Sequence, residues 1–210
     1  MRIRLLAGLM LVAALAAPAI AQTPPAGTPP GGGRGGGRGG GRGRAIAQMT
    51  LSSTAFADGA MIPARYAQNG DEKSPPLSWA GAPDSAVSFL LVVHDLNAVT
   101  GNGLDDVLHW MVWNIPATAT SLAEGLPQGG QLPDGTRQIS QTGPYYRGPG
   151  AAASGPVHHY VFELYALDTM LDVPAVGQSP AATRTAIVAA MAGHVRGKAV
   201  TVGLFRRPAP

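Results

Sequence analysis

The chain has 210 residues, of which 45% are hydrophobic and 13% charged, and it contains no cysteine. Without cysteine no disulfide can form, so the folded part must depend on a hydrophobic core. The formal net charge is +3, but six of the 15 Lys and Arg residues fall within residues 1–44, and all 12 acidic residues follow them. Residues 45–210 therefore carry 9 basic and 12 acidic groups, a net charge of −3. This balance excludes a basic nucleic-acid-binding domain.

Residues 1–21 have the pattern of a signal peptide. Arg2 and Arg4 precede an apolar run over residues 5–17, and Ala19 and Ala21 occupy the small-residue positions of a cleavage site. This pattern predicts cleavage after Ala21, a periplasmic or secreted protein, and no transmembrane segment after cleavage. An uncleaved membrane anchor is the alternative, although the apolar run is short for a membrane span.

Residues 22–44 are rich in Gly, Pro and Arg. This composition offers too little apolar surface to offset chain entropy, so we expect a disordered linker. Its four arginines could alternatively contact an anionic envelope polymer or lipid. Export makes nucleic acid an unsuitable partner.

Residues 45–210 have the length of one ordinary domain with a substantial core. Four short apolar and β-branched runs predict buried strands, over residues 87–93, 108–115, 160–167 and 199–205. Long Gly/Pro-containing loops rather than helices join the central strands, which favours antiparallel pairing. The sequence therefore predicts a mainly β domain.

One helix is expected late in the chain. Ser179 suits its N-cap, Pro180 its first position and Gly193 its end. Ile187, Val188 and Met191 keep helical spacing between these signals. A final strand should follow the helix.

The segment from residue 143 to 168 is the strongest indication of function. A Gly/Pro loop containing Gly148 and Pro149 leads into a strand that begins with His158, His159 and Tyr160. Glycine allows backbone N–H groups to approach a ligand, and the strand fixes ring donors beside the loop. His158 and Tyr160 should share one strand face, and His159 should point the other way.

Several segments in order resemble the phosphatidylethanolamine-binding protein family, and most closely its bacterial Raf-kinase-inhibitor-like branch. They are Ser74-Pro75-Pro76-Leu77-Ser78-Trp79, His94-Asp95-Leu96-Asn97-Ala98, His109-Trp110 through Asn114-Ile115-Pro116, Tyr146-Arg147-Gly148-Pro149 and His158-His159-Tyr160. The resemblance covers roughly residues 49–206. It implies an antiparallel β-sandwich with a late C-terminal helix and a final strand, and a small anion pocket at one end.

The resemblance assigns ligand-binding roles to particular positions, namely Asp95, His109, Gly148, Pro149, His158 and Tyr160. Three residues depart from the family's Asp-Pro-Asp-Ala-Pro motif, because Leu96, Asn97 and Val99 replace the first Pro, the second Asp and the second Pro. The pocket thus keeps its His and Tyr donors but loses one carboxylate.

The expected function is binding of a small anion, phosphate or a phosphorylated head group, with regulation of an envelope protein as the family-level extension. We expect no cofactor. A zinc site is a weaker alternative, because the histidines lack helical i, i+4 spacing and neighbouring pairs point to opposite strand faces. A hydrolase using the same His/Asp pocket is the enzyme alternative, although no Gly-x-Ser-x-Gly motif is present.

Overall fold

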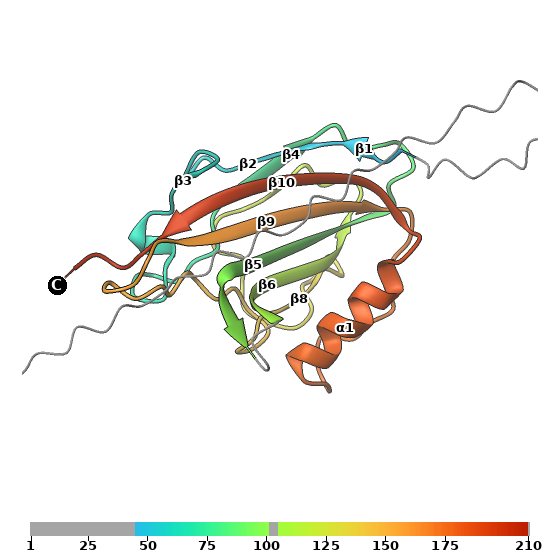
Figure 1. Ribbon diagram of the computed structural model, residues 1–210. Coiled ribbons are helices and arrows are strands. Elements are labelled where there is room, and N and C mark those ends of the chain that lie inside the picture. Colours follow the sequence, from blue (N-terminus) through green and yellow to red (C-terminus); the bar gives the residue numbers. More distant parts are fainter. Residues whose placement is uncertain (1–44, 101–104, 210) are drawn as a thin grey trace, which may run out of the picture. The chain divides into compact units, whose positions relative to one another are not determined.

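The computed structural model describes residues 45–100 and 105–209. The segments predicted as signal peptide (1–21) and linker (22–44) lie outside these residues. The described part forms two β-sheets, with an α-helix on the outer face of the larger one (Figure 1).

The larger sheet has the strand order β1-β10-β9-β5-β6-β8, and β3 also pairs with β10. Its strands are β1 (Ala47–Gln48), β3 (Ala60–Met61), β5 (Ser88–Thr100), β6 (Asp105–Pro116), β8 (Arg137–Ile139), β9 (His158–Leu167) and β10 (Val195–Phe205). The pairs between β10, β9, β5, β6 and β8 are all antiparallel. The short strands β1 and β3 run parallel to β10. The predicted antiparallel architecture is therefore confirmed for the central strands.

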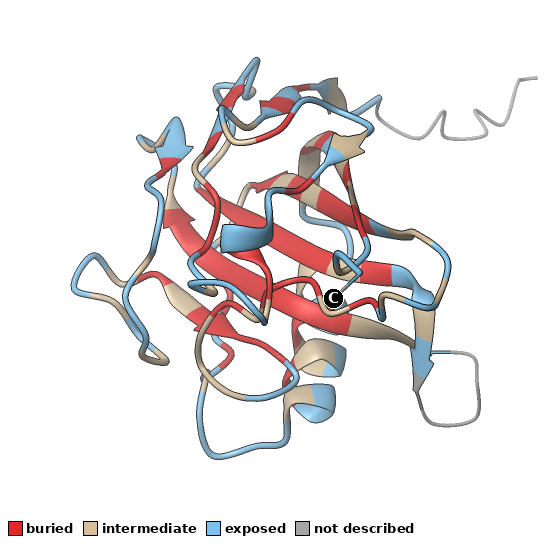
Figure 2. Cartoon of the chain, turned by 90° about the vertical axis from the view of Figure 1, so that its left-hand side faces the viewer, coloured by how far each residue is buried: buried red, intermediate tan, exposed pale blue. Residues whose placement is uncertain are grey.

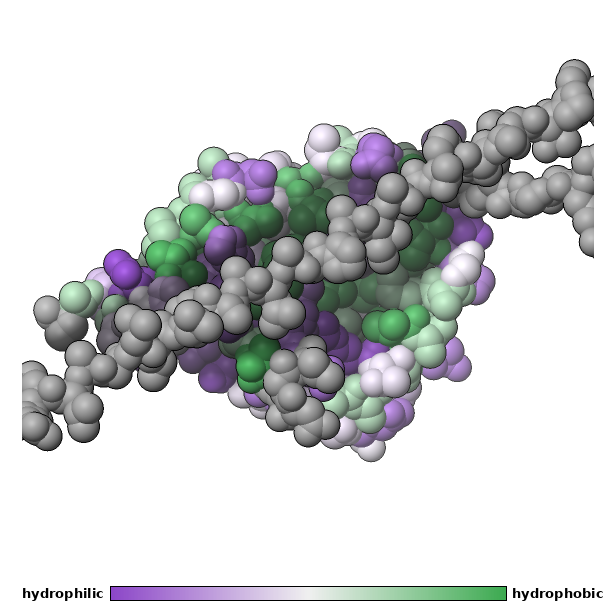
Figure 3. Space-filling view, viewed as in Figure 1, coloured by the Kyte–Doolittle hydropathy of each residue, from purple (hydrophilic) through white to green (hydrophobic). Residues whose placement is uncertain are grey.

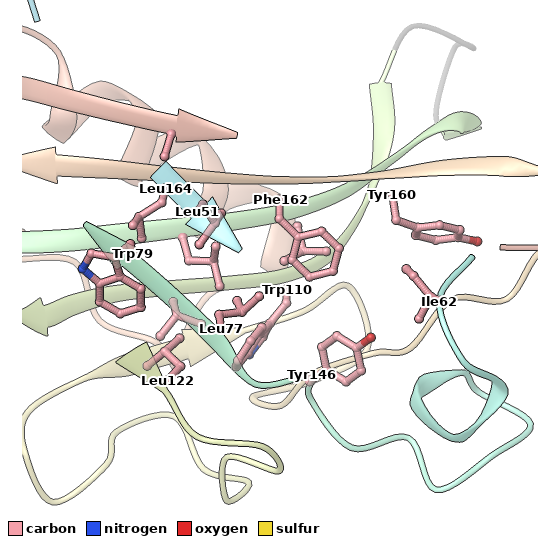
Figure 4. Packing of buried hydrophobic residues seen from close by; sticks show 14 of the residues in the cluster. Leu51, Ile62, Leu77, Trp79, Trp110, Leu122, Tyr146, Tyr160, Phe162 and Leu164 are labelled. Carbon is pink, nitrogen blue, oxygen red and sulfur yellow. The ribbon is translucent and has the colours of Figure 1, made fainter. Parts of the chain in front are cut away.

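The smaller sheet has the order β2-β4-β7 and is antiparallel. Its strands are β2 (Thr50–Ser52), β4 (Leu77–Ala80) and β7 (Ser121–Leu122), and a short 3-10 helix, η1 (Ala64–Tyr66), lies between β3 and β4. The main core packs between the two sheets, and its large side chains include Trp79, Trp110, Tyr146 and Phe162 (Figure 4).

The central strand β5 is buried on both faces, which explains its nearly continuous apolar sequence. Phe89, Leu91 and Val93 face the main core, whereas Leu90 and Val92 belong to a second cluster on the outer face. This alternation is the period of two expected of a strand. The burial of the central strands is visible in Figure 2.

The helix α1 (Pro180–Met191) covers the second cluster and begins where the sequence predicts. The Ser179 hydroxyl accepts a hydrogen bond from the Ala182 backbone N–H at 3.2 Å, as an N-cap should. Ile187 is fully buried against the sheet. Gly193 has a φ of 80°, which a glycine adopts without strain, and β10 begins two residues later.

Asn114, near the end of β6, joins this strand to the segment before the helix. Its side-chain amide donates to the Leu171 carbonyl at 3.0 Å and accepts from the Leu171 N–H at 2.8 Å. Its own φ is 58°, in the left-handed region that asparagine tolerates better than most residues. The buried asparagine thus satisfies two backbone groups that would otherwise lack partners.

We predict that Asn114→Ala destabilises the protein by about 2–4 kcal/mol, because two buried backbone groups lose their partners and alanine is strained at positive φ. Asn114→Gly should cost less, since only the hydrogen bonds are lost. Urea unfolding of both variants measures the difference. Equal costs would contradict a contribution from backbone strain.

Candidate functional site

A β-bulge directs His109 toward the interior. Val93 of β5 pairs with Trp110 and His94 pairs with Leu108, so His109 is an extra residue in β6. Such a bulge re-aims a side chain and is common beside functional sites. As a result His109 is only 3% exposed, and its ring contacts that of Tyr160 edge to face at a centroid distance of 5.0 Å.

Asp95 supplies a buried carboxylate at the same end of the sandwich. Its Oδ1 accepts hydrogen bonds from the backbone N–H groups of Asn97 and Ala98, at 2.9 and 3.2 Å. Its Oδ2 lies 2.7 Å from Nδ1 of His158. Only 2% of Asp95 is exposed, so every one of these contacts offsets the cost of burying its charge.

His158 and Tyr160 share one face of β9, as their spacing predicts. Their rings stack with a centroid distance of 6.4 Å, and Tyr160 pairs directly with Asp95 across the sheet. His159 is exposed, and both its backbone N–H and its Nδ1 lie within 3 Å of Asn97 Oδ1. The prediction that His158 and Tyr160 share one face of the strand and that His159 points the other way is therefore confirmed.

The Gly148 loop packs against η1. A Cβ at Gly148 would lie 2.3 Å from the Tyr66 carbonyl oxygen, so glycine is required here by the close approach of another backbone segment. The Gly148 carbonyl accepts from Gln68 Nε2 at 2.9 Å, and the carbonyl of the buried Pro149 accepts from the Gln68 N–H at 3.0 Å.

The loop N–H groups expected to form an anion nest have partners within the chain. The Gly148 N–H donates to Glu72 Oε1 at 3.3 Å. The N–H groups of Gly150 and Ala151 donate to the Tyr160 hydroxyl oxygen at 3.1 and 3.3 Å. The side chains, more than the loop backbone, therefore offer the groups for a ligand.

The structure adds Gln68 and Glu72 to the surroundings of the site. Neither belongs to a recognisable motif, and both reach the Gly148 loop from nearly 80 residues away. The positive φ of Glu72, 52°, is a backbone feature that the sequence does not indicate. These two residues can be identified only from the folded structure.

The protonation of the site follows from burial. Desolvation lowers the pKa of His109, although the Arg147 carbonyl, 2.9 Å from Nδ1, opposes this shift. Since Nδ1 donates to this carbonyl, neutral His109 carries its lone pair on Nε2. Desolvation likewise raises the pKa of Tyr160 to about 12, so its hydroxyl stays protonated at neutral pH.

The side chains of four of the six predicted residues thus lie together in the site, namely Asp95, His109, His158 and Tyr160. Gly148 and Pro149 border it through their backbone. Two imidazole rings, one phenol and one carboxylate supply the hydrogen-bonding groups of the site. Among the residues that the structure describes, no three His, Cys, Asp or Glu side chains gather as a metal site.

The chain is similar to known proteins over most of its described part. A sequence model of the phosphatidylethanolamine-binding protein family matches residues 52–206. A UPF0098 protein of Methanothermobacter thermautotrophicus is 44% identical over 161 residues, which cover 76% of this chain and 99% of the relative. A candidate lipoprotein of Mycobacterium tuberculosis, LppC, is 36% identical over 163 residues, covering 77% and 74% of the two chains.

A solved structure shows the same fold. The phosphatidylethanolamine-binding protein homologue CT736 of Chlamydia trachomatis superposes with a TM-score of 0.62 at 30% identity, over 76% of this chain and 98% of the homologue. The β-sandwich with its polar end is thus of a known class, and the chain belongs to the phosphatidylethanolamine-binding protein family. None of the helices in the described part is both long and apolar enough to cross a membrane.

We predict that Tyr160→Phe destabilises the loop at residues 150–151, because two backbone N–H groups lose their acceptor at a cost of about 1–3 kcal/mol each. Hydrogen exchange of the Gly150 and Ala151 amides should accelerate, and urea unfolding should shift to lower concentration. Tyr165→Phe is the matched control, because the Tyr165 hydroxyl donates to Glu163 on the outer face. Unchanged exchange of these amides in Tyr160→Phe would contradict the role of the Tyr160 hydroxyl in anchoring this loop.

Proposed function

We propose that the protein is an exported binding protein for a small anion, either phosphate or a phosphorylated head group. The observation that supports this most directly is the pairing of His158 with the buried Asp95 beside Tyr160. The name of the M. tuberculosis relative, a candidate lipoprotein, and the signal-peptide pattern of residues 1–21 support export. Regulation of an envelope protein would extend this role.

The carboxylate of Asp95 prepares His158 to act as a donor. Since Nδ1 of His158 faces Asp95, the Nε2 atom is the ring nitrogen left for a ligand. The imidazolium form of a histidine donates from both ring nitrogens, so with Nδ1 facing the carboxylate it would offer Nε2–H to an anion. The side chain of His158 is 18% exposed, in contrast to 3% for Asp95, so a ligand can reach the histidine but not the carboxylate.

His159 provides a matched control for the test. Both histidines lie at the start of β9, but His159 is on the opposite face and pairs with Asn97. We predict that His158→Ala weakens binding of inorganic phosphate and of phosphoethanolamine roughly ten- to a hundredfold, the effect of one charge-assisted donor. His159→Ala should change either affinity less than threefold. Calorimetric titration decides the matter, and equal effects of the two substitutions would refute the assignment.

His109 should make binding depend on pH. Because burial lowers its pKa, the ring is neutral at pH 7 and offers an acceptor to the ligand. Protonation turns Nε2 into a donor, so phosphate affinity should increase as pH falls below the ordinary imidazole value of ~6.5. His109→Gln should remove this increase while retaining binding at pH 7.5. An increase that persists in His109→Gln would assign it to another group, such as His158.

The lone pair on His109 Nε2 also supports a second candidate, hydrolysis. A neutral imidazole whose Nδ1 is held by a carbonyl could accept a proton from a water molecule at Nε2. A panel of ester substrates tested on the wild type and on His109→Ala would separate the two functions. Turnover that is lost in the variant favours the hydrolase, and its absence in both proteins favours the binding protein.

A further inference from the structure

The outer face of the large sheet carries a second polar cluster, distinct from the anion site. Its charged members come from four neighbouring strands and from α1, namely His94 of β5, Asp106 of β6, Glu163 of β9, Arg184 of α1 and Lys198 of β10. Their side chains are 13–35% exposed. Charges this far buried are seldom placed without partners, and clusters of this kind are frequent in functional sites.

Each carboxylate in the cluster is held by two cationic groups. Asp106 is hydrogen-bonded to Nδ1 of His94, and its Oδ1 lies 2.5 Å from Arg184 Nη1. Glu163 Oε1 lies 2.6 Å from Lys198 Nζ, and its Oε2 lies 3.5 Å from His94 Nε2. His94 therefore sits between both carboxylates, one on each side of its ring.

Nε2 of His94 is the one ring nitrogen of this residue without a hydrogen bond, and it is buried. Burial opposes protonation of His94, but the neighbouring carboxylates of Glu163 and Asp106 outweigh this effect and raise the pKa of His94. With His94 protonated, the cluster holds three cations, His94, Arg184 and Lys198, against two carboxylates. Its net charge is then +1, and the Nε2–H of His94 has the Glu163 carboxylate at 3.5 Å as its ion-pair partner.

A cavity of about 370 Å³ adjoins this cluster, between α1 and the sheet. His94, Glu163, Tyr165 and Arg184 provide its polar wall, and the apolar wall consists of Val92, Met111, Val188, Met191 and Val195. Apolar walls with a few convergent polar groups are the usual composition of a small-molecule site, and the volume lies within the usual range.

A larger groove of about 830 Å³ continues from this cavity, because Arg184 and Val188 line both. Its walls include Leu96, Val99 and Leu108. Leu96, Val99 and Val188 are exposed by 55, 62 and 54%, so three of the most exposed large hydrophobic side chains meet along one groove. Hydrophobic surface between hydrophilic residues is visible on the face that carries α1 (Figure 3).

We propose that the space along α1 binds an aliphatic monocarboxylate, a free fatty acid, with its carboxylate at Arg184 and His94 and its hydrocarbon chain along Val188 toward Leu96 and Val99. This site is separate from the anion site, because His94 and Asp95 are adjacent in β5 and point to opposite faces of the sheet. The inference therefore does not depend on the proposed function.

Charge and polarity fix the kind of ligand and its direction. A monoanion neutralises the +1 of the protonated cluster, whereas an alkylammonium ion would add to it. The exposed apolar side chains of Leu96, Val99 and Val188 line the outer groove, so a hydrocarbon chain is favoured there. The helix rises about 18 Å over its 12 residues, which sets the length over which a chain can lie beside it.

The first experiment uses the full chain and a series of ligands at concentrations below micelle formation. Each methylene buried should strengthen binding about fourfold, so decanoate should bind roughly 15-fold more tightly than octanoate in calorimetric titration. Decanol and decylammonium should bind more weakly than decanoate. Equal affinity for octanoate and decanoate, or tighter binding of decylammonium, would overturn the proposal.

Variants locate the site. Val188→Glu places a like charge on the path of the ligand and should abolish decanoate binding, whereas Val87→Glu, at a residue of similar exposure outside the groove, should leave it unchanged. Arg184→Gln should weaken binding roughly ten- to a hundredfold. His158→Ala, in the anion site, should have no effect. Equal effects of Val188→Glu and Val87→Glu would place the ligand elsewhere.

A pH titration supplies a readout that does not depend on the stability of α1. The groups that face His94 are Asp106, Glu163 and Arg184, and Tyr165 and Lys198 face it through Glu163. Deprotonation of His94 removes the net positive charge, so decanoate affinity should decline as pH rises through the raised pKa of this residue. His94→Gln should remove that decline, and a decline that persists in His94→Gln would exclude the role of His94.

Discussion

The buried carboxylate of Asp95 is the constraint on which the functional end of the sandwich depends. A carboxylate that is 2% exposed must have its charge balanced by hydrogen bonds, or the protein would be strongly destabilised. Here the balance comes from the backbone N–H groups of Asn97 and Ala98, in the irregular part of β5, and from His158. One side chain thereby fixes the irregular part of β5 and the first residue of β9.

The parts of the fold that depend on local chemistry could be predicted from the sequence. The Ser179 cap and the glycine at position 193 define the ends of α1 because they act within one helical turn. The opposite orientations of His158 and His159 follow from the two-residue period of any strand. The same rule separates Asp95, which faces the main core, from His94, which faces α1.

The rest of the site depends on contacts between distant segments and could not be predicted. The bulge at His109 exists only in the register between β5 and β6, which no single segment encodes. Gln68 and Glu72 reach the Gly148 loop because η1 packs against it, and this packing also gives the loop N–H groups internal partners. The charged cluster beneath α1 combines residues from four strands and a helix, so it forms only in the folded chain and has no pattern in the sequence.

His94 and Asp95 are adjacent in β5 but face opposite sides of the sheet. The charged cluster on the side of His94 makes the stability of the fold depend on pH. The pKa of Glu163 is lowered to about 2, mainly by its interaction with His94, so its stabilising effect is complete above the ordinary carboxyl range and is lost as pH falls toward that value. The pKa of His94 is raised, so its contribution is complete below the ordinary imidazole value of ~6.5 and is lost as pH rises through the raised value. Both contributions are present together only between these limits. The contribution of this cluster to the stability of the fold is therefore greatest from mildly acidic to near-neutral pH, the same range in which the cluster keeps its net positive charge.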